Sequence, residues 1–257
     1  MPVQGGTMAL ALATGVETPS GKDAAYENFP VGSWLLPPAL RPHVARFYAY
    51  ARAIDDIADN PKVAPTEKIS RLDGFAAAIL GQNSDPAFAK AHAMRESLTE
   101  TGVTAQHCLD LISAFQQDAI KLRYSSWDEL IDYCNRSAAP VGRFLIDLHG
   151  GCRQGYAASD ALCNALQVIN HLQDCQDDYR TLNRVYIPTQ WMEQAGASTQ
   201  DLDRSAATGP VRQVIDRCLS AIAPLLASAS TMPAGLISRQ LAMESAAILA
   251  IAHRLSD

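Results

Sequence analysis

The chain has 257 residues, of which 48% are hydrophobic and 19% charged, so it can bury one large core. Its net charge of −6 argues against a nucleic-acid partner. The six cysteines show neither a C-x-x-C pair nor the spacing of zinc ligands, which indicates reduced thiols in a cytoplasmic protein.

The N-terminal region, residues 1–25, is rich in Gly, Ala, Thr and Ser, and we expect it to be a disordered leader before a single domain over residues 26–257. Its apolar stretch is too short to span a bilayer. The longest later apolar run, near Ser245–Ala252, is also far below about 20 residues. These lengths predict a soluble protein, one still able to rest on a membrane surface.

Helical periodicity dominates from Leu40 to the C-terminus, and strand signals are nearly absent. Ser126, with Glu129 three residues later, predicts a capping box at one helix start. The pattern is typical of an all-α fold, a single-domain helical bundle around a central cavity. Predicted helices cover residues 39–59, 65–80, 87–101, 105–121, 126–138, 141–149, 159–183, 189–195, 209–230 and 235–256.

Two aspartate pairs with the spacing D-x-x-x-D stand far apart in the chain: Asp55 with Asp59, and Asp174 with Asp178. Residues four apart share one face of a helix, so each pair can direct two carboxylates at one point. Both pairs follow apolar runs, which predicts largely buried helices, where ionised carboxylates are rare unless paired or metal-bound. Two such helices facing each other would hold Mg²⁺ and, through it, a diphosphate.

Five segments of the chain resemble the squalene/phytoene synthase family, which joins or rearranges prenyl diphosphates head to head, and they come in the family's order. The first two look most like the hydroxysqualene synthase branch of the hopanoid pathway. The resemblance implies the isoprenoid synthase fold. The segments are residues 27–37, 52–59, 133–143, 165–178 and 183–188.

The resemblance also implies roles for individual residues. Asp55, Asp59, Asp174 and Asp178 would be the Mg²⁺ ligands. Arg52 and Arg184 would bind phosphate oxygens, although Arg52 could instead form an ordinary salt bridge with Asp55. Gln167 and Asn170 match family positions near the metal and the reacting carbons. Tyr48 and Tyr133 match tyrosines that line the cavity, although each could equally be a core aromatic. Phe29 and Ser33 match a segment at the pocket mouth.

The chain departs from the family pattern at two positions. Gln173 precedes the second aspartate pair, where relatives that couple two prenyl diphosphates usually carry Arg or Glu. Asn183 stands where relatives often have Gly before the arginine, which weakens the expectation for that turn. The Gln173 change fits an enzyme that holds one diphosphate rather than two.

The resemblance therefore implies a Mg²⁺-dependent conversion of presqualene diphosphate to hydroxysqualene with release of diphosphate. The implied partners are the prenyl diphosphate lipid, other enzymes of the squalene pathway and a membrane surface contacted peripherally. Two alternatives stay open. One is head-to-head coupling that yields presqualene diphosphate, squalene or phytoene. The other is a non-catalytic assembly factor built on the same fold, against which the intact aspartates and Arg52 argue.

Overall fold

A computed structural model describes Val16 and residues 35–256. Apart from Val16, the expected leader lies outside the described residues, as do two predicted site residues, Phe29 and Ser33. The described part is helical, with one isolated parallel bridge between Arg123 and Val185, and this confirms the all-α prediction. The helices are α1 (Arg41–Ala58), α2 (Pro65–Ile79), α3 (Ala89–Thr101), α4 (Gln106–Asp118), α5 (Trp127–Ser137), α6 (Ala139–Leu148), α7 (Tyr156–Gln173), α8 (Cys175–Leu182), α9 (Thr189–Ala195), α10 (Gly209–Ala229), α11 (Met232–Gly235) and α12 (Arg239–Ser256).

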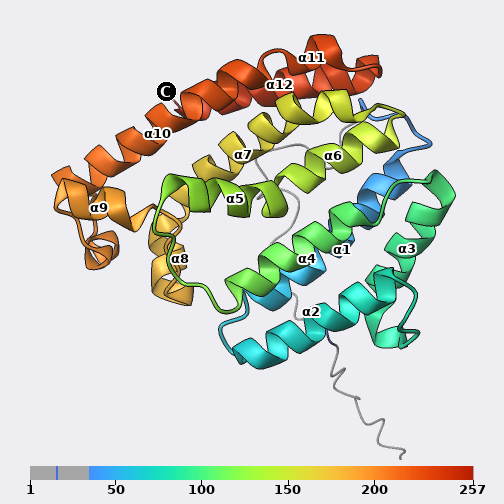
Figure 1. Cartoon of the computed structure of the whole chain (residues 1–257), viewed down its shortest axis with the longest axis horizontal. Coiled ribbons are helices and arrows are strands. Elements are labelled where there is room, and N and C mark those ends of the chain that lie inside the picture. The colour runs from blue at the N-terminus through green and yellow to red at the C-terminus, as the bar shows by residue number, and fades with distance from the viewer. Residues whose placement is uncertain (1–15, 17–34, 257) are drawn as a thin grey trace, which may run out of the picture.

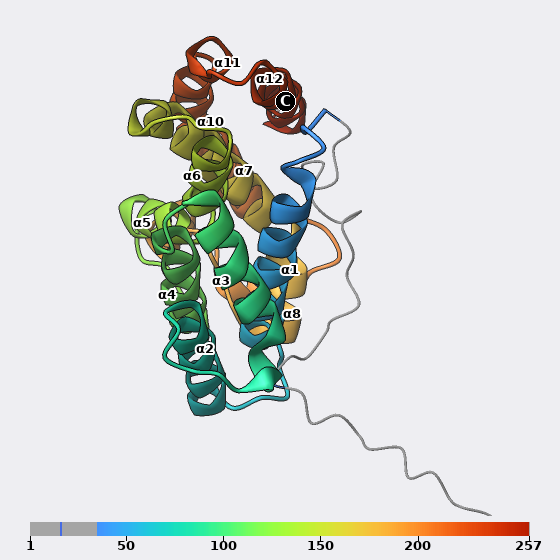
Figure 2. The same ribbon diagram turned by 90° about the vertical axis from the view of Figure 1, so that its right-hand side faces the viewer.

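The helices pack around two clusters of buried side chains (Figures 1 and 2). One cluster lies among α1 to α4, and the other lies among α5, α6, α7, α10 and α12. Helix α6 joins the two, because Phe144 stacks on Phe47 of α1 with ring centroids 4.0 Å apart. The core therefore runs through the whole described bundle, and α7 lies under α10 and α12 (Figure 1).

The single helix predicted over residues 159–183 breaks at Asp174, which has φ −95° and ψ 2°. The helical hydrogen bonds nevertheless continue, since Asp174 donates its N–H to Asn170 at 2.9 Å and Asp178 donates to Asp174 at 2.8 Å. Helix α8 turns away from the axis of α7 (Figure 1) and has no buried residue. The prediction that the second aspartate pair lies on a largely buried helix is therefore wrong, because the apolar stripe of α7 ends before the pair begins.

The chain reverses at Asn183, the one non-glycine residue with positive φ (52°) among the described residues. Asparagine adopts this left-handed conformation more readily than most side chains, so it serves here in place of the glycine that relatives often have. Arg123 donates to the Asn183 side-chain oxygen at 2.7 Å. After the turn the chain runs alongside residues 122–124. The Val185 N–H donates to the Leu122 carbonyl at 2.9 Å, and the Thr189 N–H donates to the Tyr124 carbonyl at 2.9 Å.

The predicted capping box at the start of α5 is half present. Ser126 Oγ accepts a hydrogen bond from the Glu129 N–H at 3.2 Å, as expected. The Glu129 carboxylate, however, accepts from the backbone and side chain of Ser125 and not from Ser126. Lys121 also donates to Glu129, so the carboxylate is drawn one residue upstream.

One further stretch, residues 209–235 of α10 and α11, is long and apolar enough to cross a membrane by length and composition. This stretch is longer than the apolar run near Ser245–Ala252, which was expected from the sequence to be the longest after the N-terminal region. In the described fold α10 buries one side against α7, through residues spaced three or four apart. They are Val211, Val214, Cys218, Ile222, Leu226 and Ala229.

Candidate active site

The first aspartate pair spans the end of α1, with Asp55 in the last turn of the helix and Asp59 directly after it. Arg52 bridges Asp55 at 3.2 Å and Asp56 at 2.9 Å. The salt bridge that the sequence allowed is therefore present, and it extends to a third carboxylate that the D-x-x-x-D pattern does not include. Asp56 is buried, whereas the Asp55 side chain keeps 30% of its surface exposed and can still be reached by a ligand.

Asp59 directly follows α1 and pairs with Arg184, which follows α8. Arg184 Nη1 lies 2.8 Å from Asp59 Oδ1, with the Asp59 side chain 34% exposed and the Arg184 side chain only 3% exposed. This contact spans 125 positions of sequence and joins the ends of the two aspartate segments. Arg184 was predicted to bind phosphate, but the structure puts it beneath Asp59 in the protein interior.

The second aspartate pair is also accessible to solvent. Asp174 is exposed at the junction of α7 and α8, and Asp178 is partly buried. Within residues 35–256 no three His, Cys, Asp or Glu side chains lie close enough together to bind one metal ion. A cage built of protein ligands alone is therefore absent from this part of the chain. Mg²⁺ does not require one, because it usually retains waters and takes one or two carboxylates together with substrate phosphates. The accessible carboxylates fit that mode of binding.

Gln167 lies two turns before Asp174 on α7 and Asn170 lies one turn before it, and both are partly buried. Gln167 Nε2 lies 3.2 Å from His171 Nε2. Because an amide nitrogen can only donate, this contact assigns the His171 proton to Nδ1. Tyr48 is partly buried on α1, one turn before Arg52. The predicted polar residues of α1 and α7 are thus neither fully exposed nor part of the apolar core.

Tyr133 lies in a buried polar cluster that sequence reasoning did not predict. It is 1% exposed, and its hydroxyl donates to Asp118 Oδ2 at the end of α4. Tyr124 donates to the other Asp118 oxygen at 3.4 Å. Burial raises the pKa of Asp118 to about 6, although Arg184 and Tyr133 act in the opposite direction. Burial also raises the pKa of Tyr133 well above its usual value, so this phenol remains protonated.

His171 and Tyr186 complete the cluster. Their rings stack with centroids 3.5 Å apart, and Tyr186 also stacks on Tyr124 at 5.3 Å. Burial, reinforced by the Arg184 charge, lowers the pKa of His171 to about 3. The imidazole is therefore neutral at pH 7 and adds no positive charge to the site.

The C-terminus of α1 is held by two cations. Lys68 of α2 donates to the Ala58 carbonyl at 2.6 Å, and Arg184 Nη2 lies 3.4 Å from the same oxygen. Cations favour the carbonyl end of a helix, so both contacts stabilise the place where Asp59 leaves α1. Burial, followed by the Arg184 charge, lowers the pKa of Lys68.

Several residues of this site were not predicted from the sequence. His171 and Tyr186 fall inside the segments that resemble the family, so that resemblance could have found them. Asp118 and Lys68 carry no motif, and only their burial marks them.

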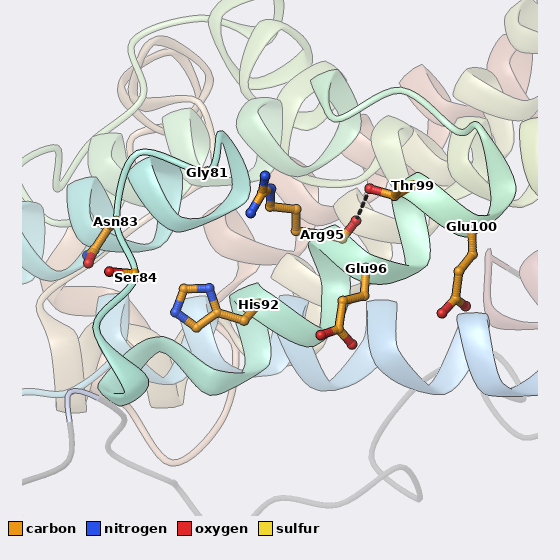
Figure 3. Close-up of a pocket in the computed structure, with 8 residues that line it drawn as sticks. All are labelled: Gly81, Asn83, Ser84, His92, Arg95, Glu96, Thr99 and Glu100. Carbon is orange, nitrogen blue, oxygen red and sulfur yellow. Dashed lines mark hydrogen bonds between the residues drawn. The ribbon is translucent and has the colours of Figure 1, made fainter.

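A cavity of about 610 Å³ lies elsewhere, between the α2–α3 loop and α3 (Figure 3). None of the predicted site residues lines it, and most of its lining is exposed. Its side chains carry mixed charge, with Arg95 reaching over the loop at Gly81 and two glutamates on α3. It has no geometric connection to the aspartate pairs. The lining residues are Gly81, Asn83, Ser84, His92, Arg95, Glu96, Thr99 and Glu100.

Comparison with known proteins finds similar proteins over most of the chain. The chain is 42% identical over 241 residues to a hydroxysqualene synthase of Zymomonas mobilis, covering 93% of this chain and 80% of the relative. It is 40% identical over 244 residues to a hydroxysqualene synthase of Rhodopseudomonas palustris, covering 95% and 83%. A crystal structure of the squalene synthase HpnC from Alicyclobacillus acidocaldarius superposes with a TM-score of 0.76 at 32% identity, covering 90% of this chain and 87% of that one.

The family model named squalene/phytoene synthase matches residues 23–257. This range contains both aspartate pairs, the polar residues of α7 and the buried cluster around Asp118. The chain therefore belongs to the squalene/phytoene synthase family, as its motifs predicted, and is a prenyl diphosphate-processing enzyme.

Proposed function

We propose that this protein converts presqualene diphosphate to hydroxysqualene and releases diphosphate, with Mg²⁺ as cofactor. The observation that carries the proposal is the contact between Arg184 and Asp59, 2.8 Å long, which ties the end of the second aspartate segment to the first. Relatives named hydroxysqualene synthase, 40–42% identical over more than nine tenths of the chain, support the choice of reaction.

The proposed diphosphate site uses the accessible carboxylates Asp55, Asp59, Asp174 and Asp178 as Mg²⁺ ligands. When bound, the metal would neutralise the charge of the departing diphosphate. Arg52 would donate to phosphate oxygens from the same face of α1, since its guanidinium already reaches two carboxylates there. Arg184 would bind the Asp59 carboxylate from the interior side of the protein.

Ionisation breaks the bond between carbon and the diphosphate oxygen and leaves a carbocation. Water then forms the new carbon–oxygen bond and loses one proton to give the alcohol. Water arriving earlier would capture the cation at the wrong stage, so the pocket must otherwise stay dry. Gln167, Asn170 and Tyr48 combine polar atoms with partial burial, which suits holding one water molecule. Tyr133 would contribute indirectly, because its hydroxyl donates a hydrogen bond to the buried Asp118.

Head-to-head coupling of two prenyl diphosphates is the main alternative, because phytoene synthases are also related to this chain, at 25–29% identity. Gln173 favours the reaction that uses one diphosphate. This residue is exposed at the end of α7 and supplies no cation for a second diphosphate group.

The deciding experiment gives the purified full chain presqualene diphosphate and Mg²⁺ without a nicotinamide cofactor. The expected products are diphosphate and a C30 alcohol, while farnesyl diphosphate alone should be a poor substrate. A reaction with EDTA in place of Mg²⁺ is the control. Efficient conversion of farnesyl diphosphate to presqualene diphosphate, squalene or phytoene would replace this proposal with the coupling reaction.

The lipid nature of the substrate supports peripheral contact with a membrane. Four large apolar side chains are exposed on α12 and the segment leading into it, namely Ile237, Met243, Ile251 and Leu255. The exposed charges of α12 include Arg239 and Arg254, whereas its one acidic residue, Glu244, is buried. An apolar face flanked by cations suits an anionic bilayer surface.

A further inference from the structure

Both terminal nitrogens of Arg184 donate hydrogen bonds within the protein, whereas its buried Nε has no hydrogen-bond partner among the described residues and lies 3.9 Å from Asp118 Oδ1. Nη1 donates to Asp59 at 2.8 Å and to the Tyr186 hydroxyl at 3.0 Å. Nη2 donates to the Asp118 carbonyl at 3.0 Å and reaches the Ala58 carbonyl at 3.4 Å. A guanidinium holds its donors in one fixed plane, so these contacts determine its orientation.

The burial of Arg184 argues against direct binding of phosphate. Turning toward a ligand would leave the Asp118 and Ala58 carbonyls and the Tyr186 hydroxyl without this donor in a buried setting, which is costly. Asp59, by contrast, is partly exposed on its other side. A ligand arriving from solvent therefore meets Asp59 first, with Arg184 behind it.

We propose that Arg184 is a positioning residue that holds Asp59 in its binding orientation, and that Tyr186 and Asp118 in turn hold Arg184. This inference rests on the proposed function, because Asp59 matters as a ligand of the metal–diphosphate group. We call the four residues Tyr186, Asp118, Arg184 and Asp59 the buried relay.

The buried relay also contacts Tyr133, one of the predicted site residues. Tyr133 of α5 donates to Asp118 of α4, and Tyr186 lies 3.5 Å from the Tyr133 hydroxyl. The connection from Tyr133 to Asp59 thus crosses α5, α4, the segment after α8 and the end of α1. A change at Tyr186, which is 6% exposed, should alter metal–diphosphate binding without touching the ligand.

The test measures binding of magnesium pyrophosphate by isothermal titration calorimetry, which does not depend on turnover. Tyr186→Phe removes the hydroxyl that orients Arg184 and keeps the ring that stacks on His171. We expect its affinity to fall about 3- to 10-fold, within the range of one ordinary hydrogen bond, because the lost contact acts on Asp59 only through Arg184. Tyr156→Phe is the matched control. The Tyr156 hydroxyl likewise donates to a carboxylate, Asp147, but α7 places it at the other end of the bundle, so affinity should change less than 2-fold.

A double-mutant cycle separates the relay from a general loss of packing. In an Asp59→Asn background, Tyr186→Phe should cause no further loss, because its effect passes through Asp59. An additive loss would overturn the inference. Tighter binding of magnesium pyrophosphate by Tyr186→Phe would also overturn the inference, because Arg184 would then compete with the metal for the Asp59 carboxylate. If Asp55→Ala and Asp59→Asn both bind magnesium pyrophosphate normally, the metal assignment fails, and the inference fails with it.

A conservative variant provides a second measurement. Arg184→Lys keeps a charge beside Asp59 but lacks the planar fork, so it should recover part of the affinity that Arg184→Met loses. Arg143→Lys is the matched control, since Arg143 pairs with Asp160 through two hydrogen bonds of 2.8 and 2.7 Å between α6 and α7. It should bind magnesium pyrophosphate like the wild type. Equal loss in Arg143→Lys and Arg184→Lys, at matched thermal stability, would show a structural effect only and overturn the inference.

Discussion

The two carboxylates of the first aspartate pair have different partners although they belong to one motif. Asp55 pairs with Arg52 on its own helix, while Asp59 pairs with Arg184 from a distant segment. The first contact is local and partly exposed, and the second is backed by a buried guanidinium. Substitutions at the two aspartates should therefore differ in how far they disturb the surrounding fold.

Removing one carboxylate from either pair should stop turnover and leave the helices intact. We expect Asp55→Ala or Asp174→Ala to reduce the rate by at least about 10²-fold, because metal binding and neutralisation of the leaving group are lost together. Diphosphate release and far-UV circular dichroism measure the two properties. Asp177→Ala is the control, since Asp177 is exposed on α8 and belongs to neither pair. Near-normal rates in Asp55→Ala at saturating Mg²⁺ would contradict the assignment.

His171 should make stability depend on pH. Its pKa is about 3 in the folded chain and near 6.5 when unfolded, so between these values the unfolded chain binds more protons. The stability that neutral His171 contributes is complete above pH 6.5 and is lost as pH falls. Between pH 7 and pH 5 the free energy of unfolding of the wild type should fall by about 2 kcal/mol more than that of His171→Phe. Urea unfolding at the two pH values measures this difference, and a constant offset between the two proteins would exclude it.

The break between α7 and α8 shows how neighbouring elements decide a helix direction. The α7 side chains are buried under α10 and α12, whereas α8 packs against the short 3-10 helix Thr199–Asp203 and buries none of its residues. The chain keeps its helical hydrogen bonds through Asp174 and still changes direction. The second aspartate pair consequently sits at a bend, with Asp174 exposed and Asp178 partly buried.

The turn that ends α8 should tolerate glycine better than alanine. Asn183 has φ 52°, a conformation that costs an ordinary side chain about 1–2 kcal/mol, and its side-chain oxygen accepts from Arg123 at 2.7 Å. Asn183→Ala should therefore destabilise the chain more than Asn183→Gly, as measured by urea unfolding. Gly102→Ala supplies the control for the backbone cost alone, because Gly102 has φ 72° and no neighbouring atom within 4 Å of an added Cβ. Equal stability of the two Asn183 variants would argue against strain at the turn.

The exposed apolar face of α12 distinguishes one side of the whole molecule. Figure 2 shows α12 at the edge of the bundle beside α10 and α11, and its face combines exposed apolar side chains with Arg239 and Arg254. Water-exposed side chains as large as Ile237 (72%) and Met243 (59%) are unfavourable unless another surface covers them.

Charge on this face should weaken binding to anionic vesicles. We expect the Met243→Glu/Ile251→Glu double variant to bind phosphatidylglycerol vesicles at least several-fold more weakly than the wild type in co-sedimentation, because it removes apolar contact and adds repulsion. Leu80→Glu is the control, since Leu80 is 50% exposed and directly follows the distant α2. Equal loss of vesicle binding in both variants would point to a general charge effect. Unchanged vesicle binding together with a shift in oligomeric state would show that a second copy of the protein covers this face of α12.

The sequence alone determined most of the helices and the spacing of the aspartates, because both depend on neighbours within a turn or two of helix. It also predicted the family, through segments that each lie within a few turns. The tertiary structure decided what surrounds those residues. Arg184 meets Asp59 across 125 positions, and Asp118 is buried although nothing in its local sequence marks it. Burial and long-range pairing depend on how the helices pack around one another, so a pattern within one helix cannot specify them.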